Sequence, residues 1–503
     1  MSHSIKKVSK KSLPSVNKNK GIESSESPKV SKAKKRQLDQ EVAVNSEENE
    51  QEEFDINDFV ITKDFLRTCR KEFDLKPENL LARNTLSLVG IIGAASNLDE
   101  INSMNHIFSF SLKGKDDIAT NQENSGRCAT YSYLNTCRRW ISKILKMKNF
   151  EFSATYIFFY DKLERANYFL TKVLETLDDH DDDVKELFEK PISDGAFYGN
   201  IKSIVGKWGL SPKAAMPETY HSGDSEAMNY ILVDFLQRIG YKMRNSRSSI
   251  EDKIQMKKDS LKQVYEICVK FLGKPPEKFD LVYVDIEDKP QKLTGLNPAD
   301  LLRLATLDMD IDDFVVLGNY PFKPYYKRFQ IYDSQLMVDG SPEIFLNLPI
   351  RYLLAAAESS IRGYFPVWMA ADINRGLCPL KFAFHSKMQA TELLFGKMPD
   401  LTKAERLIAQ NTSPNHAMCI LGFDEDKEGN ITKWQIENSW GFLDANISGR
   451  DGFFSASSHW LEENVFQIVV HKKFLSENIL KHLDSPPIIL NKNDPISSSI
   501  RLQ

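Results

Sequence analysis

Hydrophobic residues recur every three or four positions through much of the N-terminal half of the chain, which is the spacing of amphipathic helices. The segments with this spacing are residues 62–73, 133–145, 151–170 and 250–275. From Phe279 onward the pattern changes to short runs of β-branched and aromatic residues bounded by Asp, Pro or Gly, which are typical of strands. These runs are residues 281–285, 314–318, 365–372 and 416–423. Helices early and strands late predict an α+β fold rather than an alternating βαβ fold.

Charge sets the N-terminal end of the chain apart from the rest. Residues 1–38 contain eleven Lys and Arg against two Glu, and residues 39–55 contain eight acidic residues and no basic one. Such segments cannot bury enough apolar surface to offset their ordering entropy, so residues 1–55 are predicted to be a disordered charged tail. Ordered structure is predicted to begin near Asp58, with Thr62 or Asp64 capping the first helix. The folded domain is assigned to residues 56–483 and a C-terminal arm to residues 484–503.

The basic part of the tail allows two interpretations. The run from Lys32 to Arg36 has the composition of a nuclear import signal, and residues 1–38 could bind nucleic acid weakly through its phosphates. A solvated tail that keeps the protein soluble explains the same composition.

Overall composition excludes several classes of protein. The net charge of −4 gives no general nucleic-acid signature. The six cysteines include no Cys-x-x-Cys pair, so neither a disulfide framework nor a zinc site is indicated, and we expect no metal and no cofactor. Neither a signal peptide nor a run of eighteen apolar residues is present, so we expect a soluble cytoplasmic protein, also nuclear if the basic run is an import signal, without membrane contact.

The segment Asn121 to Tyr133 places Gly-Arg-Cys at the start of an apolar-striped helix. Cys128 therefore falls in or near the first helical turn, where the helix dipole favours a thiolate over a thiol. Two interpretations remain open on this segment alone, because cysteine is also among the most buried residue types and Cys128 could be a core thiol. A base and an orienting group elsewhere would favour the nucleophile.

His416 and Asn438 are the candidates for those two roles. His416 opens a predicted strand, a turn-rich segment follows from Asp424 to Asn430, and a second predicted strand runs to Trp440. If the strands pair without a bulge, the hairpin is centred on residue 427, and His416 and Asn438 face each other across the ladder. An Asn carboxamide can fix the imidazole tautomer and aim its other nitrogen at a thiol.

Gln122 and Trp440 complete the candidate site. Gln122 lies six residues before Cys128, and its side-chain N–H together with the Cys128 backbone N–H can stabilise the oxyanion of a tetrahedral intermediate. Trp440 can shield the His–Asn hydrogen bond from water. Taken singly, an Asn near a hairpin end is usually a turn former and a Gln is usually on the surface. Four residues that meet the needs of one mechanism favour a Cys-His-Asn catalytic site.

With these residues identified, the sequence resembles the papain-like cysteine peptidases, and within them the bleomycin hydrolase and aminopeptidase C family. The matching motifs occur in the family's order, and the resemblance runs from about Phe59 to the C-terminus. They are Thr120-Asn-Gln-Glu-Asn-Ser-Gly-Arg-Cys128, the aromatic block from Phe152 to Leu170, Pro212-Lys-Ala-Ala-Met-Pro-Glu-Thr219, Asn415-His-Ala-Met418 and Glu437-Asn-Ser-Trp-Gly441.

The resemblance implies a papain-like fold with helical insertions, in which a helical part surrounds the nucleophile and an antiparallel β part carries His and Asn. It further implies a homohexamer with active sites facing a central cavity, and aminopeptidase activity on peptide substrates. The arm of residues 484–503 would lie in the active-site cleft, with the carboxylate of Gln503 meeting the free amine of the substrate. Asp194 and Gly195 match a substrate-lining segment, and Trp440 lies beside the site.

Three departures from the family pattern bear on specificity. Ala129 follows the nucleophile where the family usually has Trp, which predicts a cavity or a remodelled subsite. The segment Asp194-Gly-Ala-Phe-Tyr198 replaces the family's Asp-Gly-Gly-Gln-Trp, and the chain ends in Ser499-Ile-Arg-Leu-Gln503 instead of a small residue. Each departure leaves Cys128, His416 and Asn438 in place.

Two functions are therefore considered. The first is a cysteine aminopeptidase in which Cys128 attacks, His416 transfers the proton, Asn438 orients His416 and Gln122 holds the oxyanion. The alternative is a weakly active or inactive hexameric scaffold that binds nucleic acid or a protein partner through its basic N-terminal arms.

Overall fold

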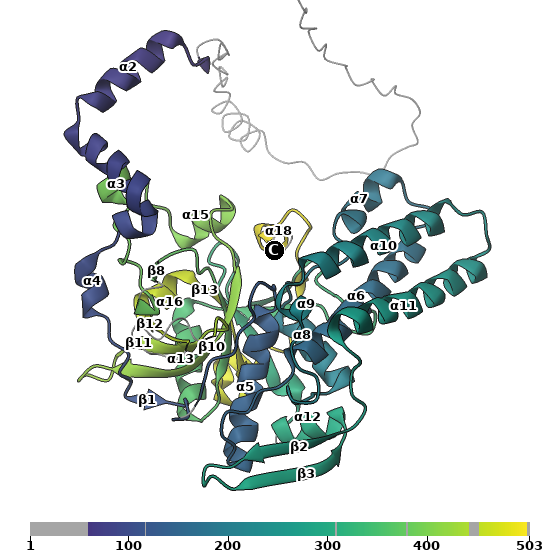
Figure 1. Cartoon of the computed structure of the whole chain (residues 1–503). Helices are drawn as coiled ribbons and strands as arrows, with labels where there is room; N and C mark the ends of the chain where they lie inside the picture. Colours follow the sequence, from purple (N-terminus) through teal and green to yellow (C-terminus); the bar gives the residue numbers. More distant parts are fainter. Residues whose placement is uncertain (1–58, 116, 307–308, 379–380, 442–451, 500–503) are drawn as a thin grey trace, which may run out of the picture. The chain divides into compact units, whose positions relative to one another are not determined.

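The computed structural model describes residues 59–499 except 116, 307–308, 379–380 and 442–451 (Figure 1). Two compact units are distinguished, residues 1–76 and 77–503. The described part of the first unit is mainly helix α2 (Lys63–Asp74). The Thr62 hydroxyl accepts a hydrogen bond from the Phe65 backbone N–H at 3.1 Å, so the helix cap is Thr62 and not Asp64. The predicted tail of residues 1–55 lies outside the described residues.

The second unit begins with helices, as the hydrophobic spacing predicts. These are α3 (Pro77–Ala94), α4 (Leu98–Ser103), α5 (Cys128–Leu145), α6 (Ala154–Glu175), α7 (Asp181–Glu189), α8 (Tyr198–Trp208), α9 (Tyr220–Gly223), α10 (Glu226–Asn245) and α11 (Ile250–Leu272). Ser153 caps α6 by accepting the Tyr156 backbone N–H at 3.0 Å, which ends the preceding loop and starts the aromatic helix. Helices α6, α10 and α11 pack against one another and form a helical group beside the sheet (Figure 1).

The strands follow, and most of them join one large sheet. A separate hairpin of β2 (Phe279–Val284) and β3 (Pro290–Leu296) comes first and contains the strand predicted at 281–285. The described main sheet has the order β14-β5-β6-β4-β13-β7-β10-β11-β12-β9-β8, with the short strand β1 paired to β10. Its strands are β1 (Phe110–Ser111), β4 (Phe314–Gly318), β5 (Lys327–Gln330), β6 (Ile344–Asn347), β7 (Val367–Ala371), β8 (Leu377–Cys378), β9 (Ala383–Phe384), β10 (His416–Glu425), β11 (Ile431–Glu437), β12 (Phe453–Ser457), β13 (Val465–His471) and β14 (Ile488–Ile489).

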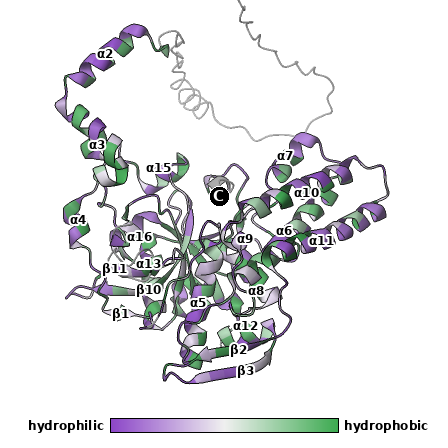
Figure 2. Cartoon of the chain, in the orientation of Figure 1, coloured by the Kyte–Doolittle hydropathy of each residue, from purple (hydrophilic) through white to green (hydrophobic). Residues whose placement is uncertain are grey.

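Both faces of the central strands are buried, which explains why these strands are apolar almost throughout. Helix α5 packs against β7 and β10 on one face, where Trp368 and Ala370 join the larger hydrophobic core. Helix α13 (Ile350–Arg362) covers the other face, where Met369 and Met418 join the second core. Hydrophilic residues lie along the outer sides of α10 and α11 (Figure 2). The α+β fold predicted from the sequence is confirmed.

Shorter helices connect and flank the strands. They are α12 (Pro298–Thr306), α14 (Glu392–Phe395), α15 (Lys403–Ile408), α16 (Ser458–Asn464), α17 (Glu477–Leu480) and α18 (Pro495–Ser499). In the C-terminal arm, β14 pairs in parallel with β5 at the edge of the sheet, Ile496 is buried in the larger core and α18 packs against α15. Gln503 lies outside the described residues.

Candidate active site

Cys128 is the first residue of α5, as the apolar spacing predicts. Burial by itself raises the pKa of a thiol, but the hydrogen bond and positive charge of His416 oppose that effect. The backbone N–H groups of Ala417 and Ala129 add hydrogen bonds to the sulfur, and the pKa of Cys128 is lowered below its ordinary value. The site therefore favours the thiolate, the form of cysteine that attacks carbonyl carbon.

His416 is the first residue of β10 and is buried. Its Nε2 donates a hydrogen bond to Oδ1 of Asn438 at 2.8 Å, which directs the other ring nitrogen to the thiol. Burial would lower the pKa of His416, but the interactions with Cys128 and the hydrogen bond to Asn438 raise it. A lowered thiol pKa beside a raised imidazole pKa describes a thiolate–imidazolium ion pair.

The hairpin that joins His416 to Asn438 differs from the prediction in its register. Cys419 pairs with Glu437 and Ile420 with Ile436, so the centre of the hairpin near the site is residue 428 rather than 427. Bulges between Ile420 and Gly422 and between Asp424 and Glu425 change the register and change it back. The predicted direct pair is wrong, and His416 and Asn438 are instead diagonal neighbours. His416 is two residues away from the position directly opposite Asn438, so the two side chains lie on the same face of the sheet. The imidazole reaches Asn438 across the diagonal.

The ring of Trp440 packs against the ring of His416. Its ring centroid lies 5.2 Å from that of His416, with the planes tilted by 31°. Asn438 is fully buried, so its hydrogen bond to His416 is kept from water.

Gln122 is buried and connects the nucleophile loop to the segment after β11. Its backbone N–H donates to the Ser439 carbonyl at 2.8 Å, and its Oε1 accepts the Ser439 hydroxyl at 2.5 Å. One Nε2 hydrogen goes to the Ser125 carbonyl at 2.7 Å. An amide nitrogen carries two hydrogens, so the second is the one that can serve an oxyanion.

Asp194 and Gly195 have different surroundings. The Asp194 carboxylate accepts hydrogen bonds from Lys162 Nζ at 2.6 Å, Ser225 Oγ at 2.5 Å, Asn229 Nδ2 at 2.7 Å and the Gly126 backbone N–H at 3.2 Å. It thus fixes the loop two residues before the nucleophile and does not line the cavity beside Cys128. Gly195 does line that cavity.

The cavity beside Cys128 lies between the helical part and the sheet. It is lined by Cys128, Arg165, Ser193, Gly195, Ala196, Phe197, Asn200, Asp333, Ser334, Leu336, Trp368, Ala370, Pro414, His416, Ala417 and Gln467. Sequence reasoning did not identify Trp368 or Gln467 as site residues. The available signal for Gln467 was one amide in the otherwise apolar run Val465 to Val470.

Ala129 is buried, and its carbonyl accepts the indole N–H of Trp368 at 3.3 Å. Trp368 in turn lines the cavity beside the nucleophile. The indole of Trp368, from β7, therefore lies next to Ala129, the small residue that follows Cys128.

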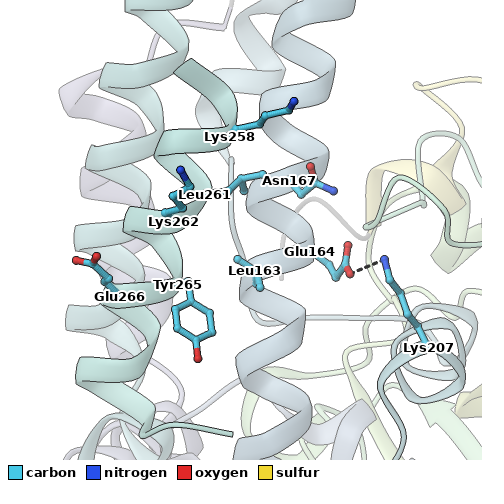
Figure 3. Close-up of a pocket in the computed structure, with 9 residues that line it drawn as sticks. All are labelled: Leu163, Glu164, Asn167, Lys207, Lys258, Leu261, Lys262, Tyr265 and Glu266. Carbon is cyan, nitrogen blue, oxygen red and sulfur yellow. Dashed lines mark ion pairs between the residues drawn. The ribbon is translucent and has the colours of Figure 1, made fainter. Parts of the chain in front are cut away.

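A second cavity, of about 640 Å³, lies between α6 and α11, and it is larger than the cavity of about 90 Å³ at Cys128. Its lining residues are Leu163, Glu164, Asn167, Lys207, Lys258, Leu261, Lys262, Tyr265 and Glu266 (Figure 3). Glu164 and Lys207 form an ion pair at 2.9 Å on its edge. None of the described residues lining it is a cysteine or histidine. Among the described helices, none combines the length and the apolar character needed to cross a membrane.

Comparisons with known proteins agree with this geometry. The sequence model of the Peptidase C1-like family matches residues 60–497. Aminopeptidase C of Listeria monocytogenes is 32% identical over 442 residues, covering 87% of this chain and 98% of that protein. Bleomycin hydrolase of Homo sapiens is 29% identical, covering 84% and 95%. The crystal structure of PepW from Lactobacillus rhamnosis superposes with a TM-score of 0.81 at 30% identity, covering 87% and 98%.

The papain-like α+β fold and the resemblance to the bleomycin hydrolase and aminopeptidase C family are thereby confirmed, and the chain belongs to the Peptidase C1-like family.

Proposed function

We propose that the protein is a cysteine aminopeptidase that removes N-terminal residues from peptides. The observation that carries the proposal is the pairing of Cys128 with a histidine whose Nε2 donates to a buried asparagine at 2.8 Å. The names of the relatives, aminopeptidase C and bleomycin hydrolase, support the same class of reaction.

In the proposed mechanism, the Cys128 thiolate attacks the carbonyl carbon of the first peptide bond and forms a tetrahedral oxyanion. The second amide hydrogen of Gln122 and the Cys128 backbone N–H stabilise that oxyanion. Imidazolium His416 gives its proton to the leaving amine as the C–N bond breaks, leaving a thioester. Neutral His416 then takes a proton from water, the hydroxide displaces the thiolate, and the ion pair is restored. Asn438 keeps His416 in the required orientation throughout.

Hydrolysis of an aminoacyl-aminomethylcoumarin substrate tests the activity. Wild type should release the fluorophore and Cys128→Ser should not, because a hydroxyl is not ionised near neutral pH. Equal rates for the two proteins, or no release by either, would contradict the proposal and favour the scaffold alternative.

The restriction to N-terminal residues is proposed to come from the C-terminal arm, residues 484–503, with the Gln503 carboxylate binding the free amine of the substrate. Wild type should therefore reject N-acetylated substrates. Deletion of residues 500–503 should permit cleavage of N-acetylated and internal peptide bonds. An unchanged product pattern after deletion would contradict the role of the arm.

We further propose a cytoplasmic homohexamer, with a nuclear fraction if the Lys32–Arg36 run acts as an import signal. Sedimentation of the full chain measures the assembly. Each basic arm would bind nucleic acid weakly and in a salt-dependent way, and six copies together would strengthen that affinity, which deletion of residues 1–38 should abolish.

A further inference from the structure

Gln467 is a buried polar residue without an evident structural role. It lies in β13, where its neighbours are apolar, and its side chain is fully buried. Neither its Nε2 nor its Oε1 has a hydrogen-bond partner among the described residues. Buried amide groups are nearly always paired in folded proteins, so this side chain calls for a partner from outside the described chain.

The register of the sheet directs Gln467 to the cavity beside Cys128. Gln467 pairs with Ala370 of β7, and Ala370 pairs with Ala417 of β10. Directly opposite residues in a sheet share a face, and Ala370, Ala417 and Gln467 all line the cavity that contains Cys128 and His416. The unpaired amide is therefore part of the wall of the active site.

The other buried polar side chains of this wall are already satisfied by the protein. Asn200 donates to the Ser334 carbonyl at 2.8 Å and accepts the Phe197 N–H at 2.9 Å. Ser334 donates to the Ile331 carbonyl at 2.9 Å and accepts the Glu343 N–H at 2.9 Å. Gln467 is thus the one buried polar side chain among the described lining residues with a donor and an acceptor open to a ligand.

We propose that Gln467 is a specificity-determining residue that binds the side chain of the substrate's N-terminal residue. A primary carboxamide, as in N-terminal Gln or Asn, is the best match, because it offers an acceptor to the Gln467 N–H and a donor to its carbonyl. Aliphatic side chains of the same size offer the Gln467 amide no hydrogen bond and leave it unpaired, so they bind less well. This inference rests on the proposed aminopeptidase function.

The test compares kcat/KM for Gln- and Met-aminomethylcoumarin, two side chains of similar size, in wild type and Gln467→Met. Wild type should prefer the Gln substrate, and the substitution should lower the Gln/Met ratio about tenfold or more, mostly through KM. A matched control is Gln435→Met, since Gln435 is a buried glutamine of the same sheet that accepts the Ser111 hydroxyl and does not line the cavity. The control should leave the ratio unchanged.

Two results with the fluorogenic substrates would overturn the inference: an unchanged Gln/Met ratio in Gln467→Met, or an equal fall of the ratio in Gln435→Met. A third would be a result with peptide substrates in which Gln467→Met alters the preference only for the residue after the scissile bond. The rate of Cys128 alkylation at pH 6 verifies that each variant keeps its folded site, and Gln467→Asn serves if Gln467→Met does not fold. Wild type that hydrolyses neither substrate refutes the proposed function itself. Hydrolysis with an unaltered ratio refutes only the role of Gln467.

Discussion

Replacing His416 with alanine removes the two largest influences that lower the pKa of Cys128 and leaves only the backbone N–H groups of Ala417 and Ala129 to oppose the effect of burial. Burial raises the pKa of this thiol, whereas the hydrogen bond and charge of His416 lower it. In His416→Ala the pKa of Cys128 is therefore expected to lie above its ordinary value, and the residue should be protonated at pH 6.

The size of the effect follows from the fraction of thiolate. A free thiol with a pKa of about 8.5 is about 0.3% ionised at pH 6, so about 300-fold is the largest gain in reactive species that complete ionisation of Cys128 could give. A stabilised thiolate is a weaker nucleophile, which takes back roughly a factor of ten. Alkylation of Cys128 by iodoacetamide at pH 6 should thus slow in His416→Ala, by up to about 30-fold.

Peptide mass spectrometry after timed alkylation measures each cysteine in one experiment. Cys137 and Cys268 are internal references, because burial raises the pKa of each to about 12, and both should stay unmodified in the two proteins. If wild-type Cys128 reacts at pH 6 no faster than Cys268, or if His416→Ala reacts as fast as wild type, the ion-pair argument is refuted.

Two further predictions concern Asp194. Asp194→Asn removes the closer ion-pair partner of fully buried Lys162, at 2.6 Å, and leaves only Asp161 at 4.0 Å, so it should lower the free energy of unfolding in urea by about 3 kcal/mol. The control Asp288→Asn breaks an ion pair with Lys148 at the same distance, but Asp288 is 79% exposed, so a loss below about 1 kcal/mol is expected; equal losses would contradict the argument from burial. The second prediction is a pH dependence. Burial raises the pKa of Asp194, but the charge of Lys162 and the hydrogen bonds outweigh it, so the pKa is lowered in the folded protein. The contribution of Asp194 to the free energy of unfolding is therefore full above the unfolded pKa of about 4 and is lost as pH falls toward the folded pKa. The difference between wild type and Asp194→Asn should therefore be constant from pH 5 to 7 and shrink below pH 4, and a difference that grows in acid would show the opposite sign.

Sequence alone determined the elements whose signals are local. The start of α5 at Cys128 and the apolar strands of the sheet depend on residues within a turn or a strand of one another. The motifs around Cys128, His416 and Asn438 were also readable, because each catalytic role requires a particular side chain at a particular spacing.

Tertiary structure decided what those side chains meet. The turn centres the His416–Asn438 hairpin on residue 428 and the two bulges cancel each other, so the register near the site follows from the pairing of the whole hairpin. Asp194 proved to hold the nucleophile loop through Gly126, a residue 68 positions away. Whether a polar side chain such as Gln467 is paired or open depends on strands far apart in the chain that only the folded sheet brings together, since hydrogen bonds act over about 3 Å in space regardless of separation along the sequence.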